Sequence, residues 1–149
     1  MFFVTFDYFF VKGNQLEIVE RNILKRLPSL KYLNLKDNLI SHIEAEDTFV
    51  EVPLLEELHL DGNQLSHTVE DTAAPFKHLT RLRVLGLARN SIKSVGNLAL
   101  AGLDSLETVD LSANVISTIQ ESPVAGLSHL SRFQVRPSYK ISKNEQEFE

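Results

Sequence analysis

Apolar residues return along this chain in one pattern, L-x-x-L-x-L-x-x-N-x-L/I, at nearly constant intervals. Within each copy, the central apolar residues alternate with other residues, as the two faces of a β-strand do. Each copy therefore predicts a short strand followed by a polar turn that contains an asparagine. Four stretches follow the whole pattern: LKYLNLKDNLI from Leu30, LEELHLDGNQL from Leu55, LRVLGLARNSI from Leu82 and LETVDLSANVI from Leu106.

Two weaker copies flank these four. One begins at Phe6 and reads FDYFFVKGNQL. The other begins at Leu130 and reads LSRFQVRPS, where Ser138 takes the place of the asparagine and Pro137 precedes it. The copies start at 6, 30, 55, 82, 106 and 130, at intervals of 24 to 27 residues. This regular spacing predicts a single repeat array rather than a chain of separate domains.

The second half of each repeat also carries regularly spaced apolar residues, for example Val95, Leu100 and Leu103. The third repeat departs from this spacing because it contains an insertion at 68–75, TVEDTAAP. An insertion confined to one repeat could lie where a partner is met, or it could be neutral. The sequence does not choose between these two interpretations.

The complete pattern resembles the leucine-rich repeat family, in its typical 24-residue class. That class occurs in Toll-like receptors, chaoptin-like adhesion proteins and Slit-like secreted proteins, and the resemblance extends over about residues 6–135. It implies an α/β-type repeat solenoid, a curved right-handed coil with a parallel β-sheet on its concave side. One short strand per repeat and an irregular or short helical convex side are expected. The resemblance also implies a protein-binding module of a receptor or cell-adhesion ectodomain.

The asparagine of each copy has a structural role in this picture. Where the chain turns inward after the strand, backbone N–H and C=O groups leave water and need partners. An asparagine side chain both donates and accepts hydrogen bonds, so one residue can satisfy groups on its own turn and on the adjacent turn. We therefore expect a ladder of stacked asparagines, formed by Asn14, Asn38, Asn63, Asn90 and Asn114.

Strand residues between the leucines are the candidate binding residues. They face away from the predicted core, and they differ from repeat to repeat, so they can encode specificity for a protein partner. The alternative is that they are ordinary solvated residues, with Lys36 and Asp61 as a weak surface pair. The candidates on the concave face are Tyr8, Phe10, Lys12, Tyr32, Asn34, Lys36, Glu57, His59, Asp61 and Arg132.

Composition and charge narrow the range of functions. The chain has 149 residues, a net charge of −5 and no cysteine. The acidic balance argues against a nucleic-acid interface, which normally has a basic face, and disulfides and Cys-ligated zinc are excluded. No apolar stretch approaches the roughly 20 residues that span a bilayer. The absence of cysteine and of N-glycosylation motifs keeps a cytoplasmic scaffold open as the alternative to an extracellular or cell-surface location.

The ends of the predicted array carry apolar residues instead of caps. Phe2 and Phe3 lie at one end, and Phe133 and Val135 lie at the other, followed by a polar tail at 137–149. Terminal repeats normally need a polar outer face. We therefore expect an interior fragment of a longer array, or a short array whose ends are hidden in a homodimer.

Catalysis and metal binding have little support in the sequence. No G-x-S-x-G nucleophile motif, glycine-rich phosphate loop or H-E-x-x-H motif is present. His42 and His67 occupy equivalent positions in neighbouring repeats and could share a metal, although solvent-facing turn positions are the simpler explanation. We expect no enzyme activity, catalytic residue, cofactor or metal.

Overall fold

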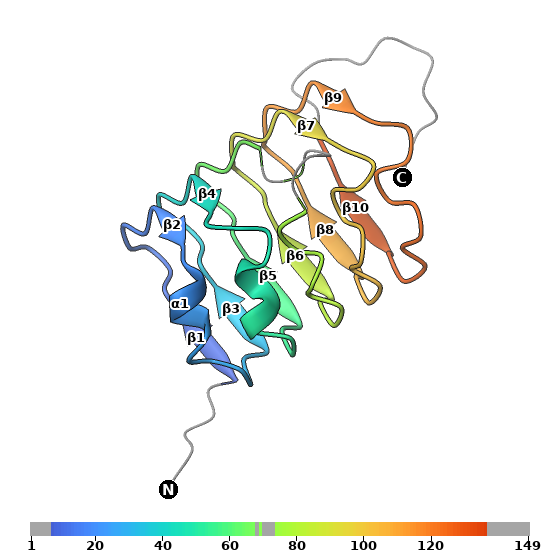
Figure 1. Cartoon of the computed structure of the whole chain (residues 1–149). Helices are drawn as coiled ribbons and strands as arrows, with labels where there is room; N and C mark the ends of the chain where they lie inside the picture. Colours follow the sequence, from blue (N-terminus) through green and yellow to red (C-terminus); the bar gives the residue numbers. More distant parts are fainter. Residues whose placement is uncertain (1–6, 68, 70–73, 137–149) are drawn as a thin grey trace, which may run out of the picture.

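Six short strands form one parallel sheet in the computed structural model, which describes residues 7–67, 69 and 74–136. The strands lie side by side in chain order, so each repeat adds its strand next to that of the preceding repeat (Figure 1). This confirms the predicted parallel solenoid; Phe6 and the tail at 137–149 lie outside the described residues. The strands are β1 (Tyr8–Phe10), β3 (Tyr32–Asn34), β5 (Glu57–His59), β6 (Val84–Gly86), β8 (Thr108–Asp110) and β10 (Arg132–Gln134).

A second, two-residue strand is present in four of the repeats, where the sequence predicted only one strand per repeat. These strands pair in parallel across neighbouring repeats, as β2 with β4 and as β7 with β9. The two pairs lie on either side of the third repeat, whose insertion at 68–75 falls largely outside the described residues. The additional strands are β2 (Ile18–Val19), β4 (His42–Ile43), β7 (Ser94–Val95) and β9 (Thr118–Ile119).

Helical structure in the described residues is limited to two single turns. They are α1 (Arg21–Leu24) and the 3₁₀ turn η1 (Thr48–Glu51), which lie next to each other in neighbouring repeats (Figure 1). Arg21 joins them, with its guanidinium 2.6 Å from Asp47 and 2.8 Å from Glu51. No helix within the described ranges is long and apolar enough to cross a membrane.

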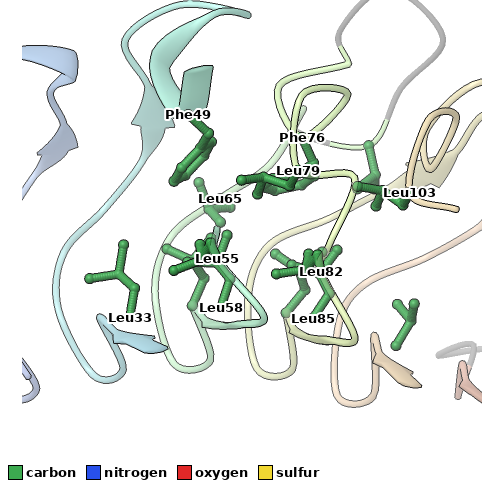
Figure 2. Packing of buried hydrophobic residues seen from close by; sticks show 14 of the residues in the cluster. Leu33, Phe49, Leu55, Leu58, Leu65, Phe76, Leu79, Leu82, Leu85 and Leu103 are labelled. Carbon is green, nitrogen blue, oxygen red and sulfur yellow. The ribbon is translucent and has the colours of Figure 1, made fainter. Parts of the chain in front are cut away.

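The core consists of stacked columns, because each repeat places the same kind of side chain against its neighbours. Leu58 and Leu85 come from adjacent strands and are fully buried. In the second half of the repeats, the rings of Phe49 and Phe76 face each other with centroids 5.8 Å apart. Figure 2 shows these columns, with the phenylalanines at the side of the core away from the strand leucines. No repeat could bury these side chains alone, which explains the dependence of each repeat on its neighbours.

The asparagines link adjacent repeats through their side chains. The Nδ2 group of Asn63 donates to the carbonyl of Leu60 in its own turn, at 2.9 Å, and to that of Leu35 in the preceding repeat, at 3.0 Å. Its Oδ1 accepts the N–H of Ile40 at 3.0 Å. Asn38, Asn90 and Asn114 make equivalent bonds. Each bonds to a carbonyl and an N–H group of the preceding repeat and to a carbonyl of its own turn.

Asn14, in the first repeat, makes a smaller set of contacts. Its Nδ2 donates to Val11 at 3.0 Å and to Lys12 at 3.4 Å, both in its own turn, and these bonds are exposed. The next asparagine, Asn38, also reaches Val11 but from the following repeat. In the described part of the chain, Asn38 is therefore the first asparagine whose side chain links two repeats.

The two ends of the core are less closed than its middle. An apolar hollow of about 100 Å³ lies at the N-terminal end, with Phe9, Val11 and Leu16 among its lining residues. At the other end, Phe133 and Val135 are only partly buried against the core. Association of two copies through these ends remains a prediction.

Exposed ion pairs also connect neighbouring repeats. The Arg83 guanidinium makes two hydrogen bonds to the Glu107 carboxylate, at 2.8 and 3.1 Å. This contact holds the pKa of Glu107 below its ordinary value and raises that of Arg83. Because both groups are exposed, we assign the pair a small role in stability compared with the buried columns.

Candidate functional site

The concave face is the side of the six-stranded sheet that points away from the core. The strand register places its side chains in three rows that run across all the repeats. The first row is Tyr8, Tyr32, Glu57, Val84, Thr108 and Arg132. The second is Phe10, Asn34, His59, Gly86, Asp110 and Gln134. The third, just after the strands, is Lys12, Lys36, Asp61, Ala88, Ser112 and Arg136.

Four rings gather at the N-terminal part of this face, and we call them the aromatic cluster: Tyr8, Phe10, Tyr32 and His59. Tyr32 is central, with its ring centroid 5.7 Å from Tyr8 and 5.1 Å from both Phe10 and His59. These separations are typical of interacting aromatic pairs. Tyr8 and Phe10 are 64% and 63% exposed, so the cluster presents ring surface to solvent.

Glu57 lies beside the aromatic cluster, because its strand position is in register with Tyr32. One carboxylate oxygen of Glu57, Oε2, is 3.1 Å from Nε2 of His59. The other ring nitrogen of His59 is 4.0 Å from Oδ2 of Asp61. His59 thus connects the rings of the cluster to two carboxylates.

Two of the predicted binding residues, Asn34 and Asp61, are buried instead of free for a partner. They are only 9% and 6% exposed. Oδ1 of Asn34 accepts the N–H of Lys36 at 3.1 Å, and Oδ1 of Asp61 accepts the N–H of Ala88 at 3.0 Å. Both side chains satisfy backbone groups just after a strand, so their identity serves the fold. A binding role for these two side chains stays a prediction, and their burial makes them weaker candidates than the exposed residues of the face.

Asp110 has the same function in its repeat. Its Oδ1 accepts the N–H of Ser112 at 2.9 Å. A short polar side chain that accepts the backbone N–H two residues later is a common local motif. The positions of Asn34 and Asp110 in the sequence could have indicated this motif. Asp61 could not be found in this way, because its hydrogen bond goes to the next repeat.

The Asp61 carboxylate lies directly over Gly86 of the neighbouring strand. A Cβ atom at Gly86 would lie 2.5 Å from Oδ2 and 2.9 Å from Oδ1. Lys36 Nζ is 3.1 Å from Oδ2, although the two groups are not aligned for a hydrogen bond. Gly86 therefore provides the space that lets Asp61 reach Ala88.

Replacement of Gly86 with alanine is expected to displace the Asp61 carboxylate and break its bond to Ala88. The loss of that buried hydrogen bond should lower the free energy of unfolding by about 1–3 kcal/mol. In a chain that carries Asp61→Ala, the Gly86→Ala change should lower the free energy of unfolding by less. The loss in the double variant should therefore be smaller than the sum of the two single losses. Urea unfolding of the two single variants and the double variant measures this coupling.

Asp110 provides the matched control. It is in register with Gly86 but bonds to its own strand end. The losses in the free energy of unfolding caused by Asp110→Ala and Gly86→Ala should therefore be additive. Additive effects for Asp61 and Gly86, or an unchanged stability of Gly86→Ala, would contradict the close packing described here.

The charged residues of the N-terminal part of the face are largely paired. Lys36 pairs with Asp61, and Lys12 Nζ lies 3.6 Å from Asp37. Asp37 also contacts Arg89, two repeats further on, at 3.3 Å. This contact passes over Gly62, where any Cβ would overlap the Asp37 carboxylate. Asp37 and Arg89 were not among the predicted binding residues, because they lie in the turns, one position after the third row.

The structure does not bring all the predicted binding residues together. Arg132 is exposed in β10, at the opposite end of the sheet from the aromatic cluster. The N-terminal candidates that remain accessible are those of the aromatic cluster with Lys12, Lys36 and Glu57. These residues define the candidate binding site.

His42 and His67 are exposed, and each ring is close to the hydroxyl of the preceding serine. The Nδ1 atom lies 3.0 Å from Ser41 Oγ in one case and 2.7 Å from Ser66 Oγ in the other. Among the residues that the structure describes, no group of three or more His, Cys, Asp or Glu side chains is arranged to hold a metal ion.

Comparison with known proteins agrees with this geometry. The family model described as leucine rich repeat matches residues 8–65 and 72–136. A chain of the LRIM1/APL1C complex has the same fold, with a TM-score of 0.71 and 20% sequence identity. The match covers 78% of this chain and 21% of that chain.

Several curated relatives are receptors or activators by name. Transforming growth factor beta activator LRRC33 of Danio rerio is 34% identical over 113 residues, which are 75% of this chain and 16% of that protein. Leucine-rich repeat-containing G-protein coupled receptor 5 of Rattus norvegicus is 29% identical over 126 residues, 85% of this chain and 13% of the receptor. Toll-like receptor 3 of Bos taurus is 36% identical over 85 residues, 57% of this chain and 9% of the receptor.

This chain thus spans between 9% and 16% of the length of these three relatives. The family match extends over both halves of the array, and the six strands in register supply the corresponding fold. The chain belongs to the leucine-rich repeat family.

Proposed function

We propose that this chain is a protein-binding module and that the concave face receives the partner. The observation that supports this most directly is the exposure of Tyr8 and Phe10 on a sheet whose other side is already occupied by the core. Aromatic side chains supply large contact area at low rotamer cost and are enriched at protein interfaces. In the second half of the repeats the large aromatic residues Phe49 and Phe76 are buried in the core, whereas those of β1 stay exposed, so the concave face is the surface best suited to a partner.

We further propose that the module belongs to a receptor or cell-adhesion ectodomain at the cell surface. The similarity to Toll-like receptor 3 and to G-protein coupled receptor 5 supports this assignment. Only a small part of each relative is matched, so their complete activities are not transferred to this chain.

A crosslinking experiment tests the binding face. A photoreactive benzoylphenylalanine replaces Tyr8 on the concave face or, as a control, the exposed Leu98 outside the six-stranded sheet. Proteins that crosslink at position 8 and not at position 98 are then purified. Their affinity for the wild-type chain and for Tyr32→Ala is measured by calorimetry.

Tyr32→Ala should weaken the purified partner's binding by about tenfold or more, because central aromatic residues dominate interface energetics. Leu98→Ala should leave the affinity unchanged. Preferential crosslinking from position 98, together with an unaffected Tyr32→Ala variant, would place the binding surface elsewhere and contradict the assignment.

The location is tested separately with antibodies against the described part of the chain. Cell-surface exposure predicts that intact, unpermeabilised cells stain. Staining that requires permeabilisation would reject the ectodomain and favour the intracellular scaffold. The binding-face experiment is independent of this result.

A further inference from the structure

We propose that the aromatic cluster and Glu57 together bind an arginine side chain of the protein partner. This inference rests on the proposed function, since it names the chemistry that the concave face recognises. It is carried by two independent observations, the arrangement of the rings and the pairing of the charges around them.

The rings form a surface that a flat cation can cover. Tyr32 lies between Tyr8 and Phe10 on one side and His59 on the other, with centroid separations of 5.1 to 5.7 Å. The outer rings, Tyr8 and Phe10, keep nearly two thirds of their surface exposed. A cation placed over such ring faces is attracted by their electron density.

Charge pairing distinguishes Glu57 from the other carboxylates nearby. Asp61 has Lys36 at 3.1 Å, and Asp37 has both Lys12 and Arg89 within 4 Å. Glu57, in the described residues, has no lysine or arginine at ion-pair distance and is approached only by His59.

The guanidinium of Arg83, which senses the charge of Glu57, is already engaged. Arg83 makes its two hydrogen bonds with Glu107, and Glu57 acts on it only through longer-range charge. No described residue donates a hydrogen bond to Oε1 of Glu57, because the contact with His59 involves Oε2. Glu57 therefore has an acceptor atom, Oε1, that receives no hydrogen bond from the described residues, and it has no lysine or arginine partner among them.

An arginine fits these features better than a lysine does. Its guanidinium is planar, so it stacks on aromatic faces while its N–H groups bond to a carboxylate. A lysine ammonium is a compact, strongly hydrated charge and cannot stack. A glutamate or aspartate of a partner would instead meet the charge of Glu57.

The test uses terminally blocked Gly-Arg-Gly, Gly-Lys-Gly and Gly-citrulline-Gly peptides, titrated at millimolar concentration into the ¹⁵N-labelled chain. The arginine peptide should shift the amide resonances of β1, β3 and β5, with Tyr32 and Glu57 among the most affected. It should bind about three- to tenfold more tightly than the citrulline peptide, which has the same shape without the charge.

Two variants identify the groups responsible. Glu57→Gln should remove most of the preference for arginine over citrulline, and Tyr32→Leu should weaken the binding of the arginine peptide. Glu17→Gln is the matched control, since Glu17 is exposed and lies outside the six-stranded sheet. That variant should behave as the wild type does.

Equal binding of the arginine and citrulline peptides, or the absence of shifts in β1, β3 and β5, would overturn the arginine site. Such a result leaves the proposed function testable, because the crosslinking experiment does not use these peptides. Conversely, preferential crosslinking from position 98 together with an unaffected Tyr32→Ala variant would reject the binding face even where the isolated peptide binds.

Discussion

Replacing Phe49 with alanine is expected to lower the free energy of unfolding by about 3–5 kcal/mol. Phe49 is fully buried, and its ring packs against Phe76 of the next repeat. Truncation removes the ring from a buried column and leaves a cavity between two repeats, which the close-packed surroundings can fill only in part.

Guanidinium-induced unfolding, followed by circular dichroism, measures the effect. Val50 provides the control, because it is the next residue and is 38% exposed; Val50→Ala should change the stability by much less. Phe49→Leu should give an intermediate loss, since it retains part of the buried volume. Equal stabilities of Phe49→Ala and Val50→Ala would show that the phenylalanine column does not hold the repeats together.

Asn63→Ala is the second change with a large expected effect. It leaves the Ile40 N–H without its acceptor in a buried turn. It also removes one of two asparagine donors from the Leu35 and Leu60 carbonyls, which keep Asn38 and Asn90. An unsatisfied buried group costs about 1–3 kcal/mol, so a loss within that range is expected from this single change. Thermal unfolding should show a clearly lower midpoint.

Asn14→Ala separates the linking role of asparagine from its local role. Asn14 bonds only to carbonyls of its own exposed turn, and water can replace it there. Its removal should have a much smaller effect than that of Asn63. If both variants unfold at the same temperature as the wild type, the hydrogen bonds between repeats contribute nothing measurable.

The repeat architecture could be predicted from the sequence because one physical requirement recurs in every repeat. Leu58 and Leu85 must face the same core, so the sequence has the same residue type at the same position of each repeat. The strand positions, their parallel order and the inward side of each strand all follow from that regularity. The turn asparagines were identifiable for the same reason, since Asn63 and Asn90 occupy the same place.

The candidate site was less accessible to sequence reasoning. The rows of the concave face were treated as free of structural constraint, yet Asn34 and Asp61 satisfy backbone groups. Which neighbour a side chain reaches depends on the space left by another residue, as Gly86 shows for Asp61. The sequence pattern gives the residue type at each position, but it does not show which side chains contact one another across neighbouring strands.

The additional strands were missed for a related reason. Ile18 and Val19 pair with His42 and Ile43 through backbone groups, and a strand of two residues has no alternation to detect. The aromatic cluster, by contrast, was partly visible, because Tyr8, Phe10 and Tyr32 were placed on one face by the strand period. The position of His59 against Tyr32 then depended on the register between β3 and β5.

The direction of the asparagine bonds makes the two ends of the solenoid unequal. Asn38 and Asn63 each reach back to the preceding repeat, and neither the donor nor the acceptor of the side chain reaches forward. Loss of a following repeat therefore strips hydrogen-bond partners from the backbone that remains. Among the asparagine bonds, loss of a preceding repeat instead releases polar side-chain groups, which water solvates easily. As far as the asparagine ladder is concerned, shortening the array from its N-terminal side should accordingly leave fewer backbone groups without a partner.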